Sequence, residues 1–264
     1  MPKQHLFIAG CPRSGTSPLT RLLASNREVI LGMERYANLL SVGNFKLTPE
    51  HFEEKRFFEV EEGDTFYSDF DEFHQLMPGL VDRYETAKVI GDKKPSLYKV
   101  YDEIFEAFPE AKILFIYRDV YSVASSFQAR VDNKSWSKAK DAFLAVNDWN
   151  QSLFLTREAI KQGRNIRCVD YESIFLSNKS LKPMFDFIGV AYNRRVKKAL
   201  KKIRLRSLAL GTKRELLLTT EHRQYIDDNA NFFMSKFMAK NNVLSEAPRN
   251  HNNPLLRFWK WCSS

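Results

Sequence analysis

Cysteine is scarce in this chain of 264 residues. Cys11, Cys168 and Cys262 are its three cysteines, and they are odd in number and far apart. With no CxxC pair and no cluster of cysteine and histidine, the sequence argues against a zinc site. A disulfide framework is likewise disfavoured, and a reducing compartment is favoured.

Long apolar runs are also missing. No segment approaches the roughly 20 apolar residues that a membrane-spanning helix needs. The first residues, Met1–His5, lead directly into a short apolar segment, without the apolar core of a signal peptide. From these two absences we expect a cytoplasmic protein without a transmembrane segment.

Negative charge is in deficit: 41 lysines and arginines face 32 aspartates and glutamates, which gives a net charge of +9. Such a balance indicates an acidic partner, such as a nucleotide or an acidic substrate. No recognised nucleic-acid-binding motif accompanies the charge, so we expect no specific nucleic-acid partner.

Short apolar segments typical of buried strands alternate with helical segments along the chain. The sequence predicts strands at 6–9, 29–31, 88–95 (ending in a loop), 112–117 and 166–169, and helices at 17–25, 98–108, 120–130, 136–162 and 181–188. This order predicts an α/β fold, a P-loop-like central parallel sheet with helices on both faces. We expect one domain over 1–264, with an insertion of short helices and loops at 37–88 and a basic, helical C-terminal region at 191–264.

The most informative segment is the loop from Gly10 to Ser17, which follows the first strand. Gly10 and Gly15 have the spacing of a Walker A loop, but Thr16 stands where that loop has its lysine, and a cation, Arg13, lies inside the loop. Backbone N–H groups of such a loop and the positive end of the next helix hold an anion. A kinase phosphate loop and a glycine-rich turn without ligand are the alternatives.

Two more polar segments follow strands. One is Asp92–Pro95, and the other begins at Arg118, with Ser126 eight residues later. Ligands of open α/β sheets bind at the C-terminal ends of the strands. A guanidinium fork and a hydroxyl suit a phosphate dianion, although a surface salt bridge between Arg118 and Asp119 is the plainer alternative.

Together these motifs resemble the sulfotransferase family, whose sulfuryl donor is 3′-phosphoadenosine 5′-phosphosulfate (PAPS). The spacing is closest to tyrosylprotein and bacterial-type members, with Glu34 twenty-one residues after Arg13. The resemblance implies an enzyme that binds the 5′-phosphosulfate near Arg13 and the 3′-phosphate at Arg118 and Ser126. The donor-binding residues it implies are Arg13, Ser14, Gly15, Thr16, Ser17, Arg118 and Ser126.

The resemblance also implies catalytic roles. Glu34 would take the proton of an acceptor hydroxyl, and Lys93 would stabilise the leaving phosphate, with Lys94 as the alternative lysine. The acceptor, a sugar, lipid, metabolite or tyrosine, stays open, and 37–88 is expected to shape its pocket. No metal is expected.

Two other functions compete with this interpretation. A P-loop phosphotransferase would use Asp92 as its magnesium carboxylate, and a catalytically inactive relative would bind a nucleotide or an acidic partner through its basic C-terminal region. The five histidines form no triad or metal spacing; His51 and His74 are minor alternatives for the base.

Further basic and aromatic residues lie outside these motifs. Lys213 and Arg214 are minor candidates for donor contact, and Trp149 and Asp170–Glu172 are interpreted as scaffold. The aromatic and basic segment Leu255–Trp261 permits peripheral membrane contact, although docking on the domain is favoured. The sequence leaves the oligomeric state open.

Overall fold

The computed structural model describes residues 2–59, 61, 64, 79–132, 140–211 and 217–245. Its centre is a parallel sheet of five strands in the order β2-β5-β1-β6-β7. The strands are β1 (Gln4–Gly10), β2 (Val29–Leu31), β5 (Val89–Lys93), β6 (Lys112–Tyr117) and β7 (Ile166–Asp170). The predicted α/β class and parallel sheet are confirmed.

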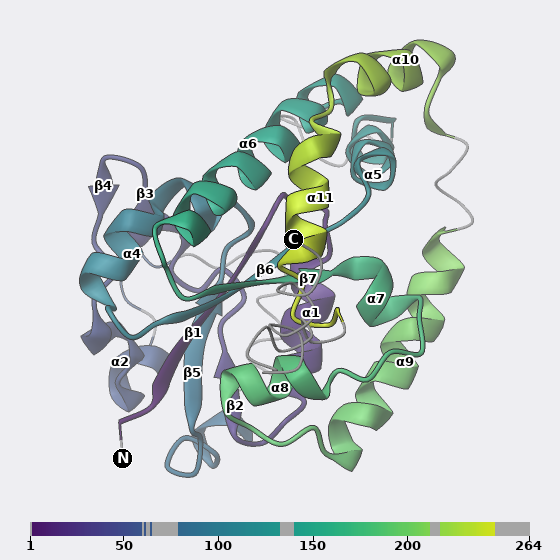
Figure 1. The fold of residues 1–264 in the computed structure, drawn as a ribbon. Helices are drawn as coiled ribbons and strands as arrows, with labels where there is room; N and C mark the ends of the chain where they lie inside the picture. The colour runs from purple at the N-terminus through teal and green to yellow at the C-terminus, as the bar shows by residue number, and fades with distance from the viewer. Residues whose placement is uncertain are drawn as a thin grey trace, which may run out of the picture.

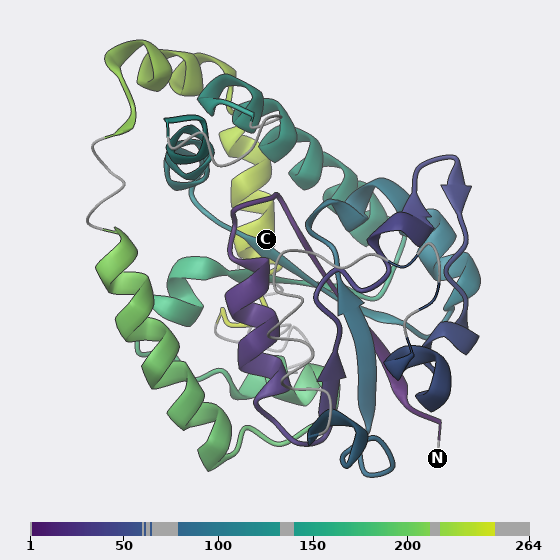
Figure 2. The same ribbon diagram turned by 180° about the vertical axis from the view of Figure 1, so that it is seen from behind.

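Helices cover both faces of this sheet (Figures 1 and 2). One face packs against α4 (Tyr101–Ala107), α5 (Val120–Asp132), α6 (Ala142–Lys161), α10 (Thr220–Asn229) and α11 (Phe232–Lys240). The other packs against α1 (Thr16–Ala24), α7 (Tyr171–Phe175), α8 (Lys182–Ile188) and α9 (Arg194–Gly211).

Alternation along the central strand β1 explains this two-sided core. Phe7 and Ala9 belong to the first cluster and Leu6 and Ile8 to the second, and all four are fully buried. Successive side chains of a strand point to opposite faces, so a continuous apolar run supplies both.

Three segments differ from the sequence-based expectations. The predicted helix 98–108 is divided into a 3-10 helix, Pro95–Val100, and α4, because the backbone leaves helical geometry at Val100, with φ of −135° and ψ of +33°. The predicted helix 136–162 starts only at Ala142, since the carboxylate of Asp141 caps it by accepting from the N–H of Leu144. Residues 133–139 lie outside the described chain.

The segment after β2 contains a hairpin that the sequence did not reveal. Strands β3 (Leu40–Ser41) and β4 (Asn44–Phe45) pair around Gly43, whose φ of +74° suits a tight turn. Two short helices follow, the 3-10 helix Pro49–Phe52 and α2 (Glu54–Phe58), as expected of short helices and loops.

Among the described residues, no helix combines the length and apolar character needed to cross a bilayer.

Candidate functional site

Strand register gathers the predicted site residues at one edge of the sheet. Lys93 of β5 lies beside Ile8 of β1, and Gly10 beside Ile116 of β6. Tyr117 of β6, in turn, pairs with Asp170 of β7. The Gly10 loop, the Lys93 segment, Arg118 and the start of α7 therefore leave neighbouring parallel strands at the same end.

The Gly10–Ser17 loop has the backbone of a tight anion cradle. Arg13 and Gly15 adopt left-handed conformations, with φ of +73° and +101°. The hydroxyl of Ser14 is buried and lies 2.5 Å from the carbonyl oxygen of Cys11 and 3.1 Å from that of Ile116. Ser14 thus fastens the loop to itself and to β6, while α1 presents its first-turn N–H groups, Thr16 and Ser17, beyond it.

Both loop glycines are required by close neighbours. A Cβ on Gly10 would lie 2.5 Å from the carbonyl oxygen of Ile116, and one on Gly15 would lie 2.4 Å from the ring of Tyr171. The ring of Tyr171, which is 7% exposed, therefore closes one side of the loop.

The cation inside the loop reaches the helix after β6. Nε of Arg13 donates a hydrogen bond of 3.0 Å to Oγ of Ser126, which is buried on α5. The two residues that the resemblance assigned to opposite ends of the donor thus touch, so the two anion positions would be neighbours.

Arg118 is held from three sides. Its guanidinium lies 4.1 Å from the ring centroid of Tyr171, its Nε lies 3.8 Å from Oε1 of Glu172, and its carbonyl accepts a 2.9 Å hydrogen bond from the indole N–H of Trp149. The buried Nε has no hydrogen-bond partner among the described residues. Stacking on an aromatic face fixes the plane of a guanidinium while leaving its outer N–H groups for an anion.

The acid beside Arg118 is unusual. Burial, and then the neighbouring carboxylate of Asp170, raise the pKa of Glu172 to about 8. The raised pKa favours the uncharged acid, which leaves the positive charge of Arg118 less compensated at the strand end.

Glu34 and Lys93 form a close ion pair. Nζ of Lys93 lies 2.6 Å from Oε1 of Glu34, and the backbone N–H of Glu34 donates to the carbonyl of Lys93 at 2.9 Å. The ammonium side chain is 2% exposed and the carboxylate 14%. The carboxylate is therefore oriented by a buried cation but still reaches the surface of the site.

Lys94, the alternative lysine, points elsewhere. Its ammonium donates to the carbonyl oxygens of Ala37 and Leu40, at 3.1 Å in the case of Ala37. Burial lowers the pKa of Lys94. Lys94 thus ties the end of β5 to the start of the hairpin and the residues just before it.

Asp92 holds the backbone around the ion pair. Its buried carboxylate accepts from the N–H groups of Arg35, Tyr36 and Lys93, at 3.1, 2.9 and 2.8 Å. Burial raises the pKa of Asp92 to about 6. Glu34, with φ of +62°, lies in the turn that these hydrogen bonds fix.

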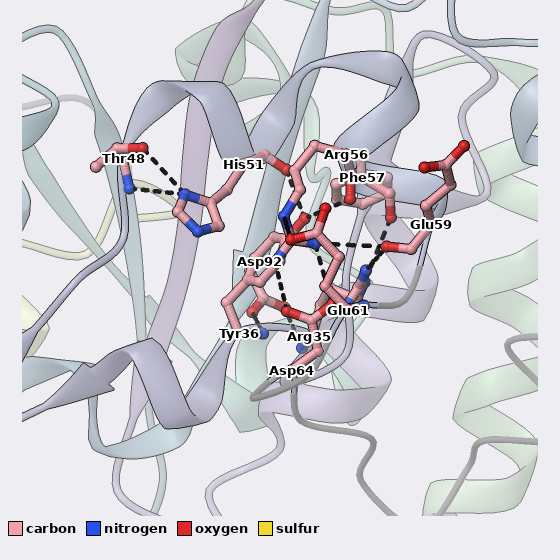
Figure 3. Close-up of polar contacts among 10 residues, drawn as sticks. All are labelled: Arg35, Tyr36, Thr48, His51, Arg56, Phe57, Glu59, Glu61, Asp64 and Asp92. Carbon is pink, nitrogen blue, oxygen red and sulfur yellow. Dashed lines mark hydrogen bonds and ion pairs between the residues drawn. The ribbon is translucent and has the colours of Figure 1, made fainter.

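A polar network continues from this turn into the following segment (Figure 3). Arg35 donates to the carbonyls of Phe57 and Glu59, and its Nη1 lies 2.6 Å from Oδ2 of the fully buried Asp64. Arg56 contacts both carboxylate oxygens of Asp64, at 3.0 and 2.7 Å. Two arginines and one aspartate thus fasten residues 56–59 and Asp64 to the turn that carries Glu34.

The minor histidine candidate His51 has a structural role. Its Nδ1 accepts from the backbone N–H of Thr48, at 3.2 Å, in a capping box at the helix start. Burial lowers the pKa of His51. The candidates His74, Lys213 and Arg214 and the segment Leu255–Trp261 lie outside the described residues. Within the described chain, no three histidine, cysteine, aspartate or glutamate side chains converge as a metal site.

Known proteins resemble this chain in sequence and in fold. Residues 5–194 match the sequence profile of the sulfotransferase family. No curated protein matches the chain.

Among solved structures, the chain resembles two sulfotransferase domains. With the domain of the Synechococcus PCC 7002 olefin synthase it shares 20% identity and a TM-score of 0.51, covering 86% of this chain and 94% of that one. With the domain of the curacin biosynthetic pathway the values are 16% and 0.54, covering 86% and 97%.

Mouse sulfotransferase SULT7A1, complexed with PAP, is 14% identical with a TM-score of 0.50, covering 92% of this chain and 86% of that one. These likenesses show the fold. The family profile covers most of the sequence, including the Gly10–Ser17 loop, Glu34, Lys93, Arg118 and Ser126. The chain therefore belongs to the sulfotransferase family.

Proposed function

We propose that the protein transfers a sulfuryl group from PAPS to an acceptor hydroxyl. The observation that carries this proposal is the ion pair of Glu34 and Lys93, which lies at the same edge of the sheet as the Gly10–Ser17 loop and Arg118. A base, a buried cation and two anion positions are the groups that sulfuryl transfer requires.

The donor would be held from both ends. N–H groups of Gly15, Thr16 and Ser17 and the positive end of α1 suit the 5′-phosphosulfate. Arg118 and Ser126 suit the 3′-phosphate, with Arg13 between the two positions because its Nε already touches Ser126. In this proposal Ser14 acts through the loop, since its hydroxyl is engaged with two backbone carbonyls.

Glu34 is proposed as the general base. Its carboxylate takes the proton of the acceptor hydroxyl as the new O–S bond forms, while the bond from sulfur to the bridging oxygen breaks. The electron pair of the broken bond stays on that oxygen, which gives adenosine 3′,5′-bisphosphate.

Lys93 is proposed to stabilise the leaving oxygen. An ammonium has three N–H donors, so one can orient Glu34 and another can meet the negative charge that develops. Lys94 is less suited, because its donors are engaged with backbone carbonyls.

The chemistry is tested by incubating the protein with ³⁵S-labelled PAPS and a panel of sugar, lipid, metabolite and tyrosine hydroxyls. We expect label in an acceptor and release of adenosine 3′,5′-bisphosphate. Phosphorylation of an acceptor from magnesium ATP, with no sulfuryl transfer, would instead support a phosphotransferase. Asp92 is poorly placed for that reaction, since both its carboxylate oxygens accept backbone hydrogen bonds.

A further inference from the structure

Helix α9 carries a dense positive charge outside the candidate donor site. Its sequence contains no acidic residue. Six of its basic side chains are exposed: Arg194, Arg195, Lys197, Lys198, Lys201 and Lys202. Among the described residues none of the six forms a salt bridge, so no acid in that part of the chain is paired with this charge.

Part of this charge lines a groove. The groove has a volume of about 390 Å³ and lies against α9 near the loop that follows α7. Its lining residues are Asn178, Tyr192, Lys197, Leu200, Lys201, Arg204 and Leu205. α9 lies on the outside of the molecule, beside α7 (Figure 1) and along α1 (Figure 2).

The three cations of the groove share one face of the helix. Lys197, Lys201 and Arg204 are spaced by four and three residues, which places them in a row. Nε of Arg204 donates to the carbonyl of Ile174 at 3.0 Å, which anchors the guanidinium. The buried Nη2 of the same group has no hydrogen-bond partner among the described atoms. The groove thus has one anchored guanidinium and two exposed ammonium groups.

The groove also has an apolar side. Leu200 is buried, Leu205 is 64% exposed, and the ring of Tyr192 lies 5.3 Å from the ammonium of Lys197. A ligand that fits both sides has an anionic end and a compact apolar body.

We propose that this groove binds a phosphate or sulfate monoester of an apolar alcohol or phenol. Charge-assisted hydrogen bonds from Lys197, Lys201 and Arg204 would hold the tetrahedral anion, and Tyr192 and Leu205 would contact the ester group. This inference does not depend on the proposed sulfuryl transfer, because none of these residues belongs to the candidate donor site.

Phenyl phosphate and phenyl sulfate are suitable probes, titrated separately into the full-length protein and followed by backbone amide NMR. We expect saturable shifts at residues 178 and 192–205 with at least one probe. A response to phenyl phosphate alone assigns the site to phosphate esters, and a response to phenyl sulfate alone assigns it to sulfate esters. A response to both probes shows that the site takes either ester. Shifts centred on residues 10–17, or no saturation with either probe, contradict the proposal.

A matched pair of variants separates a built groove from diffuse charge. Lys197→Gln with Lys201→Gln removes two lining cations, whereas Lys198→Gln with Lys202→Gln removes the same charge from exposed positions of α9 that do not line the groove. We expect the first pair to weaken binding about tenfold or more and the second about twofold or less. Equal weakening by both pairs would overturn the proposal.

Discussion

At the scale of single residues, the proposed function depends most on Glu34. Its carboxylate is oriented by Lys93 and is partly exposed. Glu34→Gln keeps the shape of the side chain but cannot take a proton. We expect turnover to fall about 10²- to 10⁴-fold, the usual contribution of a general base, with little change in the affinity for adenosine 3′,5′-bisphosphate.

Turnover with PAPS and calorimetric affinity check this prediction side by side. Glu106→Gln is the matched control, since Glu106 is an exposed acid on α4. Unchanged turnover in Glu34→Gln would remove Glu34 from the mechanism.

Glu172 predicts a pH dependence of donor affinity. Its pKa is raised to about 8, so it is neutral below that pH and becomes a carboxylate 3.8 Å from Nε of Arg118 above it. The new negative charge competes with a 3′-phosphate for Arg118 and repels it. Affinity for adenosine 3′,5′-bisphosphate should therefore fall about three- to tenfold between pH 7 and pH 9.

Glu172→Gln should abolish this fall, because it keeps the neutral form at every pH. Calorimetric titrations at pH 7, 8 and 9 with both proteins give the comparison. A parallel decline in both would mean that another group controls the pH dependence.

At the scale of elements, Gly15 lets the Gly10–Ser17 loop approach the ring of Tyr171, the first residue of α7. Gly15→Ala meets both a φ of +101° and the ring of Tyr171, so the ring or the loop must shift. We expect it to lower the free energy of unfolding by about 2–4 kcal/mol. Gly163→Ala has a similar φ, +80°, but no neighbour within 4 Å, and should cost about 1 kcal/mol.

Denaturant unfolding of the two glycine variants separates the contact from the backbone strain. Equal losses in both would show that the approach of Tyr171 does not constrain the loop.

The network of Arg35, Arg56 and Asp64 fastens residues 56–59 and Asp64 to the turn that carries Glu34. Burial alone would raise the pKa of Asp64, but hydrogen bonds from Arg56, the N–H of Glu61 and Arg35 outweigh it, and the pKa is lowered. Asp64→Asn leaves two arginines without their carboxylate and should cost about 3–5 kcal/mol of stability near neutral pH.

A lowered pKa stabilises the folded state above the unfolded pKa, and this contribution is lost as the pH falls. The difference between wild type and Asp64→Asn should therefore shrink below about pH 4, as measured by denaturant unfolding at several pH values. Glu61→Gln is the control, because Glu61 is 57% exposed in its ion pair with Arg56 and should cost at most about 1 kcal/mol. Comparable losses in both variants would contradict the role of Asp64.

At the scale of the whole molecule, the sequence predicted what depends on local pattern. The apolar strands, their alternation with helices and the polar residues at strand ends follow from short segments such as 6–17 and 112–118. Arg13, Glu34, Lys93 and Arg118 come to one edge because the strands before them are parallel, and parallel order follows from the strand–helix alternation.

Contacts between distant side chains were beyond the sequence. Tyr171 was interpreted as scaffold, yet its ring lies against Gly15 and Arg118, which depends on the pairing of β6 with β7. The bonds from Asp92 to the turn of Glu34, and from Arg35 to Asp64, join segments without a shared periodicity. Asp92, the magnesium ligand of the phosphotransferase alternative, instead accepts hydrogen bonds from backbone N–H groups.

The proposed function requires that two anion positions at this edge of the sheet hold the two ends of PAPS. Calorimetric titration with adenosine 3′,5′-bisphosphate, without metal, tests it most directly, with adenosine 5′-monophosphate and magnesium ADP as comparisons. The account predicts binding that weakens about tenfold to hundredfold when the 3′-phosphate is removed, and the same loss in Arg118→Ala for the bisphosphate alone. Absence of binding, or preference for magnesium ADP, would contradict it.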